Sequence, residues 1–171
     1  LADQECYAGL LLTVYKPAEP FFEPGEEDEI IRDLRLKLQD ADVAVVVGGY
    51  NSSNTSHIVE ICSEKMPSYL ICGAEELLSQ ERIRHFDVVA RSLVETEDWL
   101  PELPLTLAVT SGASCPDTLM NDVIEKVAGF CGYGAADIEA GLAGLSLSTG
   151  HTARSSCCWK AARMTKEIGS A

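Results

Sequence analysis

Two short stretches of the chain place small hydroxyl and amide side chains directly after an apolar run. The first is "VVVGGYNSSNTSH" (45–57), in which six polar residues follow one another after a glycine pair and a tyrosine. The second is "VTSGASCPD" (109–117), which repeats the design before a proline-marked helix start. Backbone N–H groups at helix starts, with hydroxyls and an amide, suit a doubly charged oxyanion such as a phosphate or diphosphate. The candidate anion-binding side chains are Ser52, Ser53, Asn54 and Ser114.

Helix capping is the alternative interpretation of these residues, because Ser, Thr and Asn are common N-caps. Six polar residues in a row exceed what one cap requires, and the second loop repeats the pattern. A serine nucleophile is a poorer hypothesis, since "GASCP" lacks the second glycine of the G-x-S-x-G elbow. The isolated histidines are interpreted as structural or exposed rather than catalytic: His57, His85 and His151.

The elements that must position these loops alternate along the chain. Apolar runs predict strands over 42–48, 68–72 and 105–110. Helical spacing of apolar residues predicts helices from Glu26 to Leu38 and over 55–65, 74–83 and 116–130. This alternation indicates an α/β fold with an open, mainly parallel sheet flanked by helices. In such a sheet ligands bind beyond the carboxyl ends of the strands, where both polar loops are expected.

The 171 residues suit one domain, or one domain and part of a second. We expect an irregular N-terminal segment over 1–25, in which "CYAGLLLTVY" is a candidate short strand. An α/β lobe with the anion-binding loops is expected over 26–131. Residues 132–171 are rich in Gly, Ala and Ser with weak periodicity, and are interpreted as a tail.

Composition and charge exclude several classes of function. The formal net charge of −14 argues against a nucleic-acid partner, which would need a basic face. No apolar run approaches the roughly 20 residues of a membrane span, so no membrane association or signal peptide is expected. Seven cysteines without a C-x-x-C pair predict neither a zinc site nor a disulfide framework, and they fit a reducing compartment.

Five stretches of the chain resemble a known enzyme family. They are, in order, "DVAVVVGGYNSSNTSHIVEIC", "PSYLI", "IRHFD", "TEDWLP" and "LAVTSGASCPDTLMNDVIEKV". Over about residues 33–130 they are similar to the carboxyl-terminal third of LytB-type 4-hydroxy-3-methylbut-2-enyl diphosphate reductases. The resemblance implies an oxidoreductase of non-mevalonate isoprenoid biosynthesis that forms isopentenyl and dimethylallyl diphosphate. It also implies three similar α/β lobes around a [4Fe–4S] cluster, each lobe supplying one cysteine.

Carried over by motif, the resemblance assigns substrate-diphosphate binding to Ser52, Ser53, Asn54 and Ser114. "ECYAG" (5–9) resembles the family's third cluster motif and nominates Cys6 as the metal ligand. The polar residues that should follow Cys6 are replaced, and the gap to the first polar loop is longer than in the family. One thiolate cannot hold a cluster that needs three or four.

The 171 residues contain no counterpart of the family's first two lobes, so no catalytic residue is nominated. We therefore expect a fragment or truncated relative that supplies the diphosphate-binding lobe. Two alternatives stay open: a non-catalytic diphosphate-binding module, and a subunit that completes the cluster with a partner chain or as a homo-oligomer. The implied partners are an allylic diphosphate substrate and an electron donor such as ferredoxin or flavodoxin. The implied location is the bacterial cytoplasm, with a plastid as the alternative.

Overall fold

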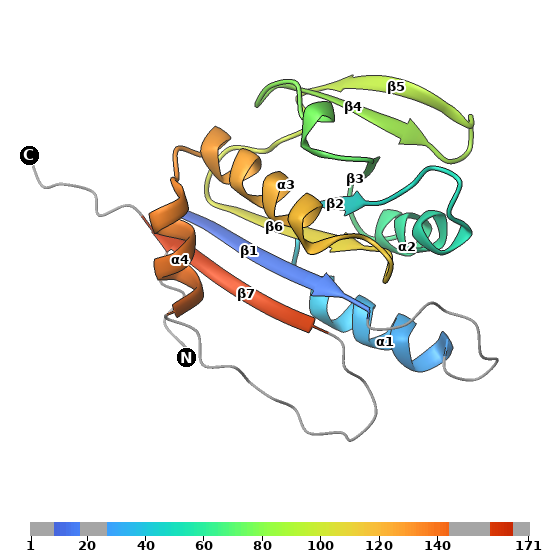
Figure 1. Ribbon diagram of the computed structural model, residues 1–171, viewed down its shortest axis with the longest axis horizontal. Helices are drawn as coiled ribbons and strands as arrows, with labels where there is room; N and C mark the ends of the chain where they lie inside the picture. The colour runs from blue at the N-terminus through green and yellow to red at the C-terminus, as the bar shows by residue number, and fades with distance from the viewer. Residues whose placement is uncertain (1–8, 18–26, 144–157, 166–171) are drawn as a thin grey trace, which may run out of the picture.

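A seven-stranded sheet forms the centre of the computed structural model (Figure 1). The structure describes residues 9–17, 27–143 and 158–165. Along the sheet the strands follow the order β5-β4-β3-β2-β6-β1-β7. The strands are β1 (Gly9–Lys16), β2 (Val43–Val47), β3 (Ser68–Ile71), β4 (Arg82–Asp87), β5 (Ser92–Glu97), β6 (Leu105–Ser111) and β7 (Cys158–Thr165). The helices are α1 (Glu27–Leu38), α2 (Ser53–Ser63), the short 3₁₀ helix η1 (Ala74–Glu76), α3 (Asp117–Phe130) and α4 (Ala135–Ala143).

The middle of the sheet is parallel and its two edges are antiparallel. β3, β2, β6 and β1 run parallel to one another, whereas the β4–β5 hairpin pairs antiparallel with β3 at one edge and β7 pairs antiparallel with β1 at the other. All five residues of β2 are buried, because helices cover both faces of the parallel strands. The expected open, mainly parallel sheet flanked by helices is therefore confirmed.

Helices cover the sheet in two layers. On one face α1 and α2 bury Leu34 and Ile58 against Ala44 and Val46 of β2. On the other face α3 and α4 pack against the alternate residues of the same strand, together with residues of β1 and β6. Successive residues of a strand point to opposite faces, which is why one apolar strand serves two cores. None of the helices in the described ranges is both long and apolar enough to cross a membrane.

The chain leaves β2 and β6 in opposite directions. After β2 it passes through α2 to β3, its neighbour on one side. After β6 it passes through α3 and α4, on the opposite face, to β7 at the far edge. β2 and β6 are adjacent, so the order reverses between them, and open α/β sheets bind ligands at such switch points.

The two ends of the described chain differ from the expectation of an irregular segment over 1–25 and a tail over 132–171. Gly9–Lys16 form β1, which confirms the candidate short strand over the described part of 6–15 and lies between β6 and β7 in the sheet (Figure 1). α4 and β7 lie within the expected tail. β1 is buried on both faces and so shows no polar alternation. β7 pairs with residues about 150 positions away in the chain, and local periodicity carries no signal for such pairing.

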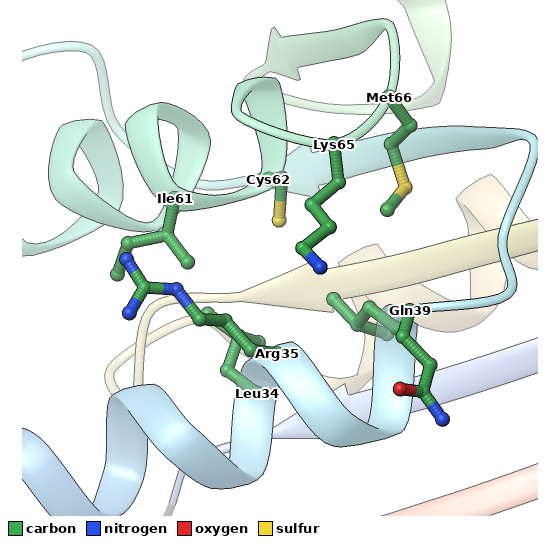
Figure 2. A pocket seen from close by; sticks show the side chains of 8 residues that line it. Leu34, Arg35, Gln39, Ile61, Cys62, Lys65 and Met66 are labelled. Atoms are coloured by element: carbon green, nitrogen blue, oxygen red, sulfur yellow. The ribbon is translucent and has the colours of Figure 1, made fainter.

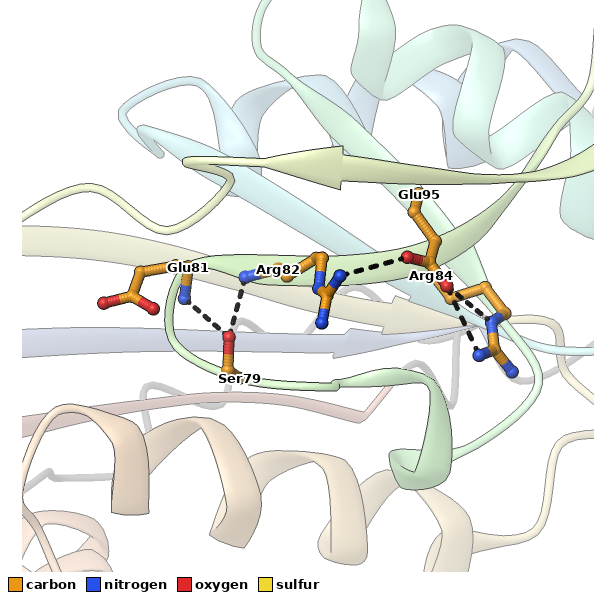
Figure 3. A network of polar contacts seen from close by, with 5 residues as sticks. All are labelled: Ser79, Glu81, Arg82, Arg84 and Glu95. Carbon is orange, nitrogen blue, oxygen red and sulfur yellow. Dashed lines mark hydrogen bonds and ion pairs between the residues drawn. The ribbon is translucent and has the colours of Figure 1, made fainter.

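The prediction of a helix over 74–83 is wrong beyond the first turn, which forms η1. After η1 the chain extends, and Leu77 pairs with Ile83 in an isolated bridge. The Ser79 hydroxyl accepts hydrogen bonds from the backbone N–H groups of Glu81 (3.2 Å) and Arg82 (3.0 Å), which reverses the chain (Figure 3). Serine side chains compete with helical hydrogen bonding in this way. The turn leads into the β4–β5 hairpin.

Candidate functional site

Both polar loops begin at the carboxyl ends of two neighbouring central strands of the sheet. Val47 of β2 and Ser111 of β6 are the last paired residues of their strands. The loops that follow, 48–52 and 112–116, therefore start side by side at the switch point. The backbone N–H of Gly48 also donates to the carbonyl of Ile71 at 2.9 Å, which ties the first loop to the end of β3.

Thr55, in the first turn of α2, lies between the two loops. Its side chain is buried. A Cβ atom added to Gly48 would lie 2.8 Å from Thr55 Oγ1, and one added to Gly112 would lie 2.9 Å from the same oxygen. One hydroxyl oxygen therefore occupies the space that a side chain at either glycine would need. Thr55 belongs to the polar run that the sequence singled out, but it was not nominated there.

The nominated residues of the first loop have different surroundings. Ser52 is the N-cap of α2, and its Oγ accepts a hydrogen bond from Thr55 N at 3.3 Å. The capping interpretation is thus correct for this hydroxyl in the state that the structure describes. Ser53 is exposed, and Asn54 is half-buried. Ser114 is exposed in the second loop.

Two polar side-chain atoms near the carboxyl ends of β2 and β6 are buried without a hydrogen-bond partner among the described residues. They are Oδ1 of Asn54 and Oγ1 of Thr110, the penultimate residue of β6. Buried polar groups in native proteins are paired with protein atoms, water or ligand. The unpaired atom of Asn54 is an acceptor, so it does not itself bind an anion, and a contact with a diphosphate would have to come from the Nδ2 donor of the same amide.

Lys16, the last residue of β1, holds the second loop. Its Nζ donates hydrogen bonds to the carbonyl oxygen of Cys115 and to Oδ1 of Asp117, each at 2.6 Å. The ammonium group thus bridges the loop and the first residue of α3. It also offsets the negative charge of Asp117, which would otherwise repel an anion at this helix start. Sequence reasoning missed Lys16 because the candidate strand ended at Tyr15 and no local signal showed that the next residue faces the second loop.

The described cysteines do not fit an iron–sulfur cluster, which the family resemblance implies. Across 9–17, 27–143 and 158–165 no three His, Cys, Asp or Glu side chains gather where they could hold a metal ion. Burial raises the pKa of the Cys62 thiol to about 12 and also raises the pKa of Cys115 and Cys131. Metal ligation needs the thiolate, which burial in apolar surroundings disfavours. Cys6 lies outside the described residues.

Two pockets lie on the α1–α2 side of the molecule. Figure 2 shows the first, which is lined by Arg35 of α1, Cys62 of α2 and Lys65, just after α2, among others. The second has a volume of about 430 Å³ and shares Arg35, Gln39 and Lys65 with the first. Arg35 is already paired with Glu64 at 2.8 Å. None of the nominated anion-binding residues lines either pocket, so these hollows are separate from the polar loops.

Comparison with known proteins agrees with the resemblance. The family model described as "LytB protein" matches residues 31–128. The 4-hydroxy-3-methylbut-2-enyl diphosphate reductase of Gloeobacter violaceus is 40% identical over 121 residues, which are 69% of this chain and 29% of the relative. The enzymes of the same name from a Synechococcus and from Microcystis aeruginosa are each 48% identical, over 55% and 57% of this chain and 24% of each relative.

A solved structure of (E)-4-hydroxy-3-methyl-but-2-enyl diphosphate reductase, described as the terminal enzyme of the non-mevalonate pathway, also matches. It is 23% identical with a TM-score of 0.40, over 57% of this chain and 28% of that one. The chain spans less than a third of the length of these curated relatives. The matched range 31–128 contains both polar loops, the whole of α2 and all but the last two residues of α3. The chain therefore belongs to the LytB family.

Proposed function

We propose that loops 48–52 and 112–116 and the start of α2 bind the diphosphate group of 4-hydroxy-3-methylbut-2-enyl diphosphate. The binding side chains are Ser52, Ser53, Asn54 and Ser114. The observation that carries this proposal is the position of Thr55, whose hydroxyl oxygen lies against the glycines of both loops at the sheet's switch point. Helix starts and small-residue loops leave N–H groups available to an anion without requiring a cation.

The chain then supplies the diphosphate-binding lobe of a reductase that acts in non-mevalonate isoprenoid biosynthesis. The relatives' names support this activity, and the allylic diphosphate is its substrate. A [4Fe–4S] cluster and an electron donor such as ferredoxin or flavodoxin belong to the same proposal. We assign no redox step to the described residues, because they do not fit a cluster. The cyanobacterial relatives support a bacterial cytoplasm or a plastid as the location.

Titration with inorganic pyrophosphate tests the binding site. We expect Asn54→Ala and Ser114→Ala each to weaken binding by roughly 1–3 kcal/mol, the scale of a charge-assisted hydrogen bond. Ser63→Ala is the matched control, because Ser63 is exposed at the opposite end of α2 and is expected to leave the affinity unchanged. Pyrophosphate should also raise the melting temperature, as any ligand selective for the folded state does. No heat of binding and no thermal shift at millimolar pyrophosphate would refute the proposal.

Cys6 is proposed separately as one ligand of the cluster. Anaerobic purification followed by measurement of iron and acid-labile sulfide per chain tests it, with Cys6→Ala alongside. We expect iron and sulfide that are lost in the variant, with the remaining ligands supplied by further chains. Equal iron in the two proteins would exclude Cys6 as a ligand and would leave the pyrophosphate result unaffected.

A further inference from the structure

A buried carboxylate lies beside the first polar loop without belonging to the nominated site. Glu76, the last residue of η1, is 8% exposed. One carboxylate oxygen accepts a hydrogen bond from the backbone N–H of Cys72 at 2.8 Å, and the other accepts one from the hydroxyl of Tyr50. Charged side chains are rarely buried without partners, so both hydrogen bonds offset the cost of burying this carboxylate.

Tyr50 sits in the middle of loop 48–52 and is held on two sides. Its ring stacks on Phe86 of β4, with centroids 4.8 Å apart and planes 14° from parallel. Its hydroxyl donates to Glu76. Burial and the nearby Glu76 carboxylate raise the pKa of Tyr50 above its usual range, so the hydroxyl keeps its proton and remains a donor.

The short helix η1, which carries Glu76, is itself attached to α3, the helix that follows the second polar loop. Lys126 Nζ donates to the carbonyl oxygen of Ala74 in η1 at 2.8 Å. A continuous set of contacts therefore runs from α3 through η1 and Glu76 to Tyr50. The chain on the N-terminal side of Tyr50 is a glycine pair, and glycine loses more conformational freedom on ordering than any other residue.

We propose that Tyr50 and Glu76 are positioning residues of the diphosphate site, whose hydrogen bond holds loop 48–52 in its binding shape. This inference rests on the proposed function. A loop that is ordered before binding loses no further conformational freedom when the ligand arrives. Preorganisation therefore raises affinity without adding a contact. Neither residue touches the diphosphate in this proposal; both act through the backbone of the loop.

Pyrophosphate titration of four variants tests the inference. Tyr50→Phe keeps the stacked ring and removes only the donor, and we expect its dissociation constant to rise about tenfold. Glu76→Ala should show a similar loss, whereas Glu76→Gln can still pair with both the Cys72 N–H and the Tyr50 hydroxyl and should stay within about threefold of the wild type. Tyr69→Phe is the control, since the Tyr69 ring packs against the core and makes edge contacts with His85 and Trp99, and its substitution likewise removes one phenol hydroxyl.

Amide hydrogen exchange of residues 48–52 in the unliganded protein gives a second readout that needs no ligand. We expect faster exchange of this loop in Tyr50→Phe than in Tyr69→Phe, with the sheet unchanged. Wild-type-like affinity in Tyr50→Phe, even with a lower melting temperature, would overturn the positioning role while leaving the proposed function intact. Absence of pyrophosphate binding in the wild type would instead overturn the proposed function and this inference with it.

Discussion

Replacement of Gly48 by alanine tests whether Thr55 holds the two polar loops together. The added Cβ would lie 2.8 Å from Thr55 Oγ1 and 2.9 Å from its Cγ2. Real Cβ contacts are longer than this, so one of the two groups must move. Thr55 is buried and β-branched, and rotation about its χ1 angle would bring another substituent towards the same space.

The expected loss of stability follows from overpacking. Forcing an extra methyl group into a close-packed site costs about 1–3 kcal/mol. Gly49→Ala is the matched control, because a Cβ there meets nothing within 4 Å and its backbone is outside the left-handed region. We expect that substitution to change the free energy of unfolding by less than about 0.5 kcal/mol.

Urea unfolding of a double-mutant cycle separates the steric cause from a general effect of alanine. The cycle comprises Gly48→Ala, Thr55→Ala and their combination. Thr55→Ala removes both colliding atoms, so the penalty of the Gly48 substitution should largely disappear in that background, with a coupling of about 1–3 kcal/mol. Additive effects, or equal losses for Gly48→Ala and Gly49→Ala, would show that Thr55 does not lie between the loops in the way described.

Three further substitutions have expected outcomes. Ser52→Ala should lower the free energy of unfolding in urea by about 1 kcal/mol through loss of the N-cap, and Ser52→Gly by only a few tenths. Lys16→Met should destabilise the protein by about 1–2 kcal/mol, whereas Asp117→Asn should have a smaller effect because that carboxylate is 81% exposed. Burial raises the pKa of Cys62 to about 12, so its proton stays bound only in the folded state as the pH rises above about 9. Wild-type stability should therefore fall with pH between 9 and 12 by up to about 1.4 kcal/mol per unit more steeply than that of Cys62→Ala, as measured by urea unfolding at successive pH values.

The core of the fold was predictable from local sequence because its elements carry strong local signals. β2 is a run of apolar residues buried on both faces, and the valines at 43 and 45–47 predict such a strand. α3 shows Met120, Val123, Ile124 and Val127 at helical spacing, and these residues are buried as the spacing predicts. The polar loops were found because each directly follows such a strand. Their assignment as a diphosphate site stays a prediction.

The edges of the sheet were not predictable in the same way. β4 and β5 expose alternate residues and carry charged side chains, with Arg82 and Arg84 on one strand paired to Glu95 on the other. These two strands form because they pair with each other and because Ser79 makes the preceding turn. The backbone carbonyl of Ser79 also accepts a hydrogen bond from the Trp99 indole. The residues 74–83 have good helix propensity, but tertiary contacts override it.

The same argument applies to the site, since its supporting residues act through pairing and turns that local patterns do not determine. Lys16 reaches the second loop only because β1 lies parallel to β6, and β1 lies outside the range 31–128 that the family model matches. Glu76 reaches Tyr50 only because the expected helix stops after one turn. The residues that contact an anion can be read from a motif, because small hydroxyls and amides after a strand have a direct chemical meaning. The residues that hold those loops in place have no such local signal, because their role depends on which strands and turns the whole chain brings together.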